Sequence, residues 1–414
     1  MARIVGRFAR VEPRRRARAF VLGLLAELPR KNCWPIAEHA GDATPAGMQH
    51  LLNRASWDAG EVRDDIRDFV VEYLGNENAV LVVDETGDLK KGTASVGVQR
   101  QYTGTAWRIE NAQVAVYLAY SSPAGHAAID RRLYVPRSWT QDLDRCRAAG
   151  IPEDLGFATK PALATEMITQ ALDAGVSAAW VTGDEVCGGD PRLSAELERR
   201  EVGYVLAVSC KRPIPTRAVV FDAGVLARCL PKKAWQRLSA GDGAKGRRYY
   251  DWAQVEINNP KEGAGNRSLL VRRNRRTGEL AFHRCYSAAP VPLTTLVRVA
   301  GRRWTVEETF QAAKGLAGLH EHQVRRWTSW HRWITLAILA HAFLVVTAAI
   351  ERTAATSPSG LAPLACGEIQ RLFAAFVSQH AQGLAHRLSW SHWRRRHQAR
   401  ARTSHYQRQI TEES

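Results

Sequence analysis

Two short apolar runs in the chain each lead into an aspartate. Residues 79–83 are Ala-Val-Leu-Val-Val and precede Asp84. Residues 178–183 are Ala-Ala-Trp-Val-Thr-Gly and precede Asp184. Continuous apolar runs of this length, rich in β-branched residues, are typical of strands buried on both faces of a sheet. We therefore expect two parallel strands whose carboxyl ends place Asp84 and Asp184 side by side.

A third acid lies in a segment that predicts a helix. Residues 303–314 contain neither proline nor glycine, and they carry Arg303, Glu307 and Lys314. At about 100° per residue, Glu307 and Lys314 lie within roughly 40° of Arg303 around the helix axis. The pattern thus predicts a carboxylate between two cations on one face, which suits a metal-bound phosphate.

The three acids together predict a metal-dependent phosphoryl-transfer site. Carboxylate oxygens are the ligands preferred by Mg²⁺ and Mn²⁺. Two such ions ~3.5–4 Å apart can activate the attacking oxygen and stabilise the leaving oxygen, without a covalent protein nucleophile. We expect Asp84, Asp184 and Glu307 to be catalytic and to bind two ions. Each acid taken alone could instead cap a loop or belong to a solvated face.

The residues around these acids resemble the DDE transposases of bacterial insertion sequences. One subgroup carries Tyr-x2-Arg-x3-Glu-x6-Lys around its last acid, and Arg303, Glu307 and Lys314 keep that spacing, with Ala300 at the tyrosine position. The stretches 84–92, 95–102 and 183–186 also resemble one branch of these enzymes. The likeness spans roughly residues 30–350 and implies a ribonuclease-H-like core.

The resemblance also implies an activity and partners. A member would cleave DNA at the terminal inverted repeats of its element and join the released 3′-hydroxyl to target DNA. It would act as a homodimer in a synaptic complex, in the cytoplasm and associated with the nucleoid. Two alternatives stay open: a ribonuclease-H-like nuclease or resolvase that cuts without joining, and an inactive DNA-binding derivative, which Ala300 keeps in view.

The order of the predicted elements gives an α/β fold class. Strands that are first antiparallel and then alternate with helices match a ribonuclease-H-like mixed sheet flanked by helices. The interval between Asp184 and Glu307 exceeds one crossover, which predicts an insertion. We expect an N-terminal helical domain that could bind the DNA end at residues 1–75, and a catalytic core in two pieces at residues 76–209 and 291–350. A β-rich insertion is expected at residues 210–290, and a basic C-terminal helical region at residues 351–414.

The charge balance favours a polyanionic partner. The 414 residues include 58 Lys and Arg against 41 Asp and Glu, a net charge of +17, which suits DNA. Residues 1–20 and 384–414 carry local charges of +6 and +5 and resemble phosphate-contacting arms, although solvated tails have the same composition. In the second segment Trp390, Trp393 and Tyr406 alternate with arginines, which fits stacking on bases or, equally, a protein core.

Individual DNA contacts can be proposed from position. Lys90, Lys91 and Arg100 follow Asp84, and Trp235, Lys245 and Arg247 lie in the predicted insertion. Arg303 and Lys314 flank Glu307, and Arg325 and Arg326 follow that segment. Trp235 would stack on an unpaired or flipped base, or else belong to the core of the insertion. Asp88, Asp190 and Glu308 are candidates for outer partners of the metal ligands.

Other patterns narrow the function by exclusion. Seven cysteines without Cys-x-x-Cys pairs argue against disulfides and zinc. The glycine pattern at residues 241–246 does not open a helix, so we expect a loop and no NAD or other organic cofactor. Residues 333–350 are apolar enough to cross a membrane, but a helix packed across a sheet has the same composition, and we expect no membrane. His320 and His322 are expected at the surface.

Overall fold

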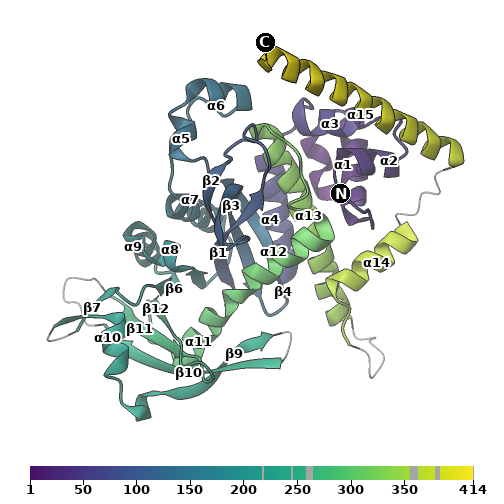
Figure 1. Ribbon diagram of the computed structural model, residues 1–414. Coiled ribbons are helices and arrows are strands. Elements are labelled where there is room, and N and C mark those ends of the chain that lie inside the picture. Colours follow the sequence, from purple (N-terminus) through teal and green to yellow (C-terminus); the bar gives the residue numbers. More distant parts are fainter. Residues whose placement is uncertain (217–218, 244–245, 258–263, 355–361, 378–382, 414) are drawn as a thin grey trace.

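A long mixed sheet forms the centre of the molecule (Figure 1). The structure is a computed structural model that describes residues 1–414 except 217–218, 244–245, 258–263, 355–361, 378–382 and 414. The strands are β1 (Val80–Leu89), β2 (Gln99–Thr103), β3 (Arg108–Ser122), β4 (Gly125–Leu133), β5 (Trp180–Gly183), β6 (Gly203–Val208), β7 (Pro213–Pro215), β8 (Val220–Asp222), β9 (Gln236–Gly243), β10 (Gly246–Glu256), β11 (Asn266–Arg273) and β12 (Leu280–Ser287).

Helices α4, α7, α12 and α13 pack against this sheet. The helices are η1 (Ala2–Arg7), α1 (Val11–Leu25), α2 (Cys33–His39), α3 (Ala46–Asn53), α4 (Ala59–Leu74), α5 (Arg137–Thr140), α6 (Leu143–Ala149), α7 (Lys160–Asp173), α8 (Glu185–Gly188), α9 (Pro191–Arg199), α10 (Ala223–Arg228), η2 (Lys232–Ala234), α11 (Leu293–Arg302), α12 (Trp304–Ala317), α13 (Trp327–Thr353), α14 (Cys366–Val377) and α15 (Leu384–Glu413).

The first part of the sheet has the predicted mixed order. Strand β1 pairs antiparallel with β3 and parallel with β5, and β5 pairs parallel with β6. Buried valines and leucines at residues 80–83 fill both faces of β1, as the apolar run predicted. This is the mixed α/β core with flanking helices that the order of the elements indicated. Strand β4 was not predicted, because Ala127 and Ala128 at its centre are poor strand formers.

The β-rich insertion continues the same sheet. Strand β12 pairs antiparallel with β6, and β11, β10 and β9 follow in order. The insertion has a small apolar core of its own, which includes Ile214, Leu269 and Phe282. Strand β9, at the end of the sheet, packs against α11, where a Cβ on Gly301 would lie 1.9 Å from the carbonyl oxygen of Ala240. Only glycine permits this close approach of β9 to the helix that precedes Glu307.

The N-terminal helices pack around the long apolar helix α13. Helix α3 begins directly after Pro45, and Asp58 caps α4 by accepting from the backbone N–H groups of Gly60 and Glu61. The most apolar stretch of 18 residues in α13 is 78% buried inside the protein, so α13 is a core helix and not a membrane span. In the N-terminal segment, Arg3 and Arg7 form ion pairs with Glu72 and Asp65 of α4.

Candidate active site

Asp84 and Asp184 lie on neighbouring parallel strands. Val83 of β1 is in register with Gly183 of β5, and Asp84 and Asp184 directly follow these two residues. The expectation that Asp84 ends its strand is wrong, because β1 continues to Leu89 through its pairing with β3. Strand β5 does end at Gly183, and Asp184 caps the short helix α8, accepting from the backbone N–H of Cys187 at 3.0 Å. Asp84 thus lies where β1 loses its parallel neighbour.

Arg303 connects Glu307 to Asp84. As predicted, Glu307 lies on a helix, in the first turn of α12, and Arg303 lies at the junction of α11 and α12. Nη2 of Arg303 donates to Oδ2 of Asp84 at 3.4 Å, and Nη1 lies 3.7 Å from Oε1 of Glu307. One guanidinium therefore links a carboxylate of β1 to a carboxylate of α12. The Glu307 side chain is 43% exposed, so it is open to a ligand.

The three acids influence one another. Burial raises the pKa of Asp84 from 3.8 to about 7; the charge of Arg303 opposes this rise, whereas the charges of Asp184 and Glu307 add to it. The three carboxylates thus share one electrostatic environment. Among the described residues, no three carboxylate, imidazole or thiol groups are close enough to form a ready-made metal site. The structure links Asp84 and Glu307 through a guanidinium, with Asp184 on the neighbouring strand, and leaves the site open.

The trio fits a divalent cation by charge and by donor type. Arg303 pairs with Asp84 and Glu307, and Asp184 lies near enough to act on Asp84, so the three ionised carboxylates and one guanidinium carry two negative charges in excess. The Nε atom of Arg303 is buried and has no hydrogen-bond partner. Oxygen donors with excess negative charge are what a hard divalent ion requires.

Lys314, the second cation of the motif, lies at a different part of β1. Its Nζ donates to the hydroxyl of Thr86 at 2.7 Å and lies 3.8 Å from Oδ1 of Asp88. Asp84, Thr86 and Asp88 alternate along β1 and therefore face the same side of the strand. Helix α12 consequently runs along β1 with Arg303 beside Asp84 and Lys314 beside Asp88.

Asp88 is the centre of a buried polar cluster that includes His322. Nε2 of His322 lies 3.1 Å from Oδ2 of Asp88, and the Lys90 ammonium lies 3.5 Å from Nδ1 and 3.3 Å from the carbonyl oxygen of His322. The expectation of a surface position is wrong for His322, whose side chain is fully buried. The left-handed cap at Gly318 turns the chain after α12 back toward β1, which brings His322 inside.

The Asp88 carboxylate in this cluster is compensated by two ammonium groups. Burial alone would raise the pKa of Asp88, but the hydrogen bond with His322 and the charges of Lys90 and Lys314 hold it below its ordinary value. Burial lowers the pKa of His322, so we assign a neutral ring whose Nε2–H donates to Asp88 and whose Nδ1 accepts from Lys90. With a neutral ring, the two ammonium groups carry the charge that balances Asp88.

The other two candidate outer acids, Asp190 and Glu308, have local partners. Asp190 caps α9 through the backbone N–H groups of Arg192 and Leu193, and Glu308 lies 3.4 Å from Nε2 of His126. Asp88 is the one of these candidates that reaches a cation of α12.

Some of the residues predicted to contact DNA are exposed, and others are held in contacts within the protein. The exposed ones are Lys91, Arg100, Arg247, Arg325 and Arg326. Lys90 and Lys314 are engaged in the Asp88 cluster. Trp235 packs against the core of the insertion with the Arg273 guanidinium 4.2 Å from its ring centroid, which favours the packing alternative. Lys245 lies outside the described residues.

Sequence reasoning missed an aromatic side chain next to the trio. Trp304 follows Arg303 directly, is exposed, and has the guanidinium of Arg248 5.7 Å from its ring centroid. Arg248 also donates to the carbonyl oxygen of Gly301 at 3.3 Å, so the β9–β10 hairpin reaches the start of α12. An aromatic residue between the two charged residues of the Arg-x3-Glu motif was the signal that could have identified it.

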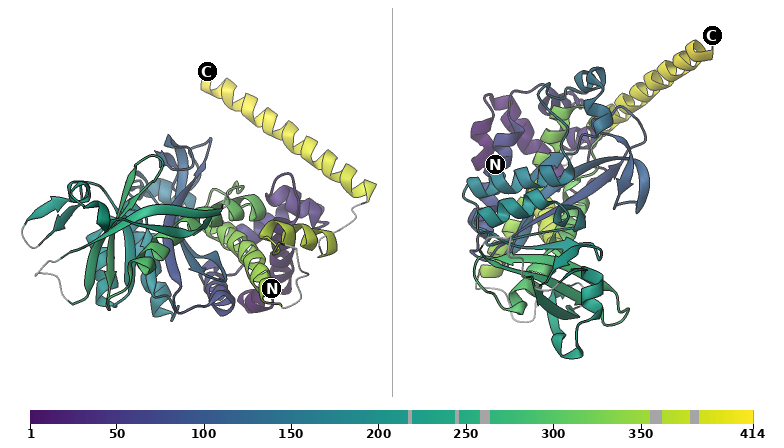
Figure 2. Two further views of the ribbon diagram at one scale, coloured as in Figure 1. Left: turned by 90° about the horizontal axis from the view of Figure 1, so that it is seen from below. Right: turned by 90° about the vertical axis from the view of Figure 1, so that its left-hand side faces the viewer.

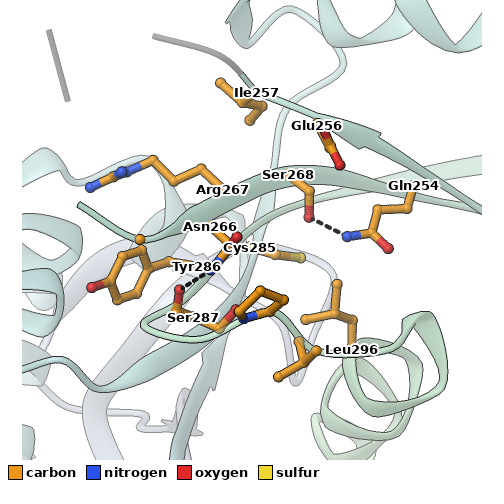
Figure 3. Close-up of a pocket in the computed structure, with 13 residues that line it drawn as sticks. Gln254, Glu256, Ile257, Asn266, Arg267, Ser268, Cys285, Tyr286, Ser287 and Leu296 are labelled. Atoms are coloured by element: carbon orange, nitrogen blue, oxygen red, sulfur yellow. Dashed lines mark hydrogen bonds between the residues drawn. The ribbon is translucent and has the colours of Figure 1, made fainter. Parts of the chain in front are cut away.

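A cavity of about 410 Å³ lies away from the trio (Figure 3). It is lined by residues of β10, β11 and β12 and by Leu296 of α11. Two of its polar side chains are engaged locally, since Gln254 donates to Ser268 at 3.2 Å and Asn266 donates to the carbonyl oxygen of Ser287 at 3.4 Å. We therefore assign the chemistry to the trio and not to this cavity.

Comparisons with known proteins indicate the family of this chain. A family described as DDE superfamily endonuclease matches residues 4–249, a range that contains Asp84 and Asp184 and ends before Glu307. The "Probable transposase for insertion sequence element IS701" of Microchaete diplosiphon is 28% identical over 189 residues. That alignment covers 45% of this chain and 47% of the relative, so the chain spans about half the length of this relative.

A solved structure gives a weaker likeness. The cryo-EM structure of a piggyBac transposase synaptic complex with hairpin DNA is 11% identical, with a TM-score of 0.42, and the match covers 91% of this chain and 75% of that chain. This score is too low to assign the fold. The family match, however, extends over more than half of the chain, and it includes both strand aspartates. The chain belongs to the DDE superfamily endonuclease family.

Proposed function

We propose that this protein is a DDE transposase that cleaves DNA at the ends of an insertion sequence and joins those ends to target DNA. The observation that supports the proposal is that Arg303 links Asp84 to Glu307 while the charges of Asp184 and Glu307 both act on Asp84. The family uses divalent metal ions, and we propose Mg²⁺ or Mn²⁺, two ions, held by the three carboxylates. When bound, such ions activate the attacking oxygen and stabilise the leaving oxygen.

The chain's own residues would orient the DNA for this reaction. Asp84 must lose its proton before it can bind a cation, and the Arg303 guanidinium at 3.4 Å favours its ionised form. If cations took the place of its guanidinium beside Asp84 and Glu307, Arg303 would be free to hold the phosphate of the DNA end. The attacking oxygen then forms its bond to phosphorus as the bond to the leaving oxygen breaks.

The exposed cations extend this site into a DNA path. Lys91 and Arg100 follow β1, and Arg325 and Arg326 lie in the loop before α13. The backbone N–H of Val96 donates to the carbonyl oxygen of Arg325 at 3.0 Å, which joins the two loops. We propose that terminal inverted repeats and target DNA lie along these residues, that the protein acts as a homodimer on paired ends, and that it works in the cytoplasm at the nucleoid.

The proposal is tested with three neighbouring pairs of acids. Each pair contrasts a member of the trio with the acid that follows it: Asp84→Asn with Glu85→Gln, Asp184→Asn with Glu185→Gln, and Glu307→Gln with Glu308→Gln. We measure cleavage and joining on a plasmid that carries both ends of the element, with Mg²⁺ or Mn²⁺. The first member of each pair should lose cleavage and keep DNA binding, whereas the second should retain both.

Each other outcome points to a different function. Cleavage without joining by the wild-type protein would indicate a nuclease or resolvase. A wild-type protein as inert as Asp84→Asn would indicate a DNA-binding derivative. Loss of cleavage in both members of every pair would show that the trio is not the site.

A further inference from the structure

Helix α15 is attached to the protein by its first half. Trp390 is fully buried and its Nε1–H donates to the carbonyl oxygen of Asp42 at 2.8 Å. The ring of Trp393 packs edge-on against Trp34 of α2, with centroids 4.7 Å apart. Arg394 pairs with Glu38 at 2.5 Å. These tryptophans therefore serve as a protein anchor, so the base-stacking role suggested by their alternation with arginines does not apply to them.

The second half of α15 extends away from the body (Figure 2). Every side chain from residue 398 to residue 404 is exposed. A helix that is polar all round gains no stability from packing, and an isolated helix of fewer than ~12–15 residues is marginal in water. The anchored half holds this outer half in position, and a binding partner would supply the remaining stabilisation.

The charge on α15 identifies the partner as a polyanion. From Leu384 to Thr411 the sequence contains no Asp or Glu. Four exposed arginines, which we call the α15 arginines, lie at the start of the projecting half: Arg395, Arg396, Arg400 and Arg402. Such a run without acids has no internal compensation, so its repulsion is relieved by phosphate groups.

The arrangement of the α15 arginines fits a duplex. At about 100° per residue, Arg395 and Arg402 form one row, Arg396 and Arg400 form a second row, and the rows lie roughly 120° apart. The small side chains of Ala399 and Thr403 lie between the rows. The major groove, about 12 Å wide, admits a helix. Two rows of arginine could therefore reach the phosphates of both walls, while the small residues allow close approach to the groove floor.

The anchor also connects α15 with the basic loop of the core. Trp34, which packs against Trp393, lines a cavity of about 320 Å³ together with Arg325 and Arg326. Both of these arginines are exposed. The anchor of α15 thus packs on α2, whose Trp34 lies beside the basic loop between α12 and α13.

We propose that the outer half of α15 lies in the major groove of duplex DNA and holds its backbone phosphates through the α15 arginines. This inference rests on the proposed function for the source of the DNA, which would be a flank of the element end or the target. Contacts to phosphates carry little sequence information, so any duplex serves as a probe.

The test uses the full-length protein with all four α15 arginines changed to Gln. A matched control changes four other exposed arginines to Gln: Arg147, Arg192, Arg199 and Arg228. Fluorescence anisotropy with a labelled duplex of arbitrary sequence, and with one of its single strands, gives affinity across a salt series. The α15 variant should lose about 100-fold in duplex affinity, and its salt slope should fall by about 3 to 4, since each phosphate contact contributes ~0.9.

Several results would overturn the proposal. The α15 variant could bind the duplex with wild-type affinity and slope, or lose no more than the control. It could lose duplex, single-strand and RNA binding equally, which would indicate a diffuse charge effect. It could change only the oligomeric mass, which would indicate that a second copy of the chain is the partner. Hydrogen exchange gives an independent check, because residues 398–404 should become protected only when the duplex is added.

The outcome is separable from that of the proposed function. If the wild-type protein cleaves element ends and the α15 variant binds duplex normally, the inference about α15 fails and the transposase proposal stands. If the wild-type protein cleaves nothing but the α15 variant loses duplex binding, the transposase proposal fails and the inference stands.

Discussion

The two ends of the contact between α12 and β1 are built in opposite ways. At one end, Arg303 faces Asp84 and Glu307, with Asp184 nearby, and negative charge is in excess. At the other end, Lys314 and Lys90 flank Asp88 beside His322, and the single carboxylate is fully compensated by positive charge. The first end is partly open and the second is buried. One end is prepared for a ligand, and the other fixes the helix to the strand.

This contrast separates the two cations of the Arg-x3-Glu-x6-Lys motif. Arg303 touches the carboxylates that would bind metal, so its partner changes when a ligand arrives. Lys314 is already held by Thr86 and Asp88. We infer that Arg303 acts in the reaction and that Lys314 positions α12, and therefore Glu307, against β1.

The largest expected effect is on catalysis. Asp184→Asn should lower the cleavage rate by about a thousandfold or more, because residues that act as a unit in catalysis fail together. Asp88→Asn should lower it far less when both are measured below their melting temperatures. The comparison fails if Asp88→Asn is as inactive as Asp184→Asn while its fold and DNA affinity are unchanged.

The next effect is on stability and concerns His322. His322→Ala leaves the buried Asp88 carboxylate without a donor, which should reduce the free energy of unfolding by about 3 kcal/mol. His320→Ala, two residues away and exposed, is the matched control and should change it little. Urea denaturation of both variants measures the difference, and equal stabilities would contradict the buried cluster.

A third effect has opposite signs at the two ends. The pKa of Asp84 is about 7 in the folded protein and 3.8 ordinarily. The folded state therefore holds the proton more tightly, and stability falls as pH rises from 4 to 7. Asp84→Asn removes this penalty and should stabilise the metal-free protein by about 2 kcal/mol at pH 8, with little effect at pH 4.

Asp88→Asn should act in the other direction. The pKa of Asp88 is lowered in the folded protein, so its carboxylate contributes stability above the ordinary pKa and loses it as pH falls through the folded pKa. This variant should be less stable than wild type at pH 8. Thermal unfolding in EDTA at pH 4 and pH 8 measures both variants, and a destabilised Asp84→Asn at pH 8 would contradict the assignment.

The smallest effect concerns the pH dependence of metal binding. Arg303→Gln removes the charge that opposes protonation of Asp84, so the pH midpoint of Mn²⁺ binding should rise by about 1 unit or less. Lys314→Gln should leave that midpoint unchanged, because Lys314 faces Asp88. A shift of equal size in the two variants would remove the distinction between the motif's two cations.

The sequence predicted the parts of the site that depend on local patterns. The apolar runs before Asp84 and Asp184 located both strands, and the helical spacing located Glu307 and Arg303 on one helix. It did not predict the continuation of β1, because the polar residues from Asp84 to Asp88 lack an apolar run and are held in the strand by pairing with β3.

The cluster around His322 depends on long-range contact. His322 lies 234 positions from Asp88 and reaches it only because the chain turns at Gly318. Spacing within one segment carries no signal for such a pair. The division of α15 into an anchor and a projecting half likewise depends on Trp34 and Asp42, which belong to the N-terminal part of the chain.

The most direct test of the account is a calorimetric titration of the protein with Mn²⁺ at pH 8. We predict binding by the wild-type protein, at least tenfold weaker binding by Asp84→Asn, Asp184→Asn and Glu307→Gln, and wild-type binding by Glu185→Gln and Glu308→Gln. If Glu307→Gln bound Mn²⁺ as tightly as wild type, Glu307 would not be a ligand, and the site formed by β1, β5 and α12 would be incorrect.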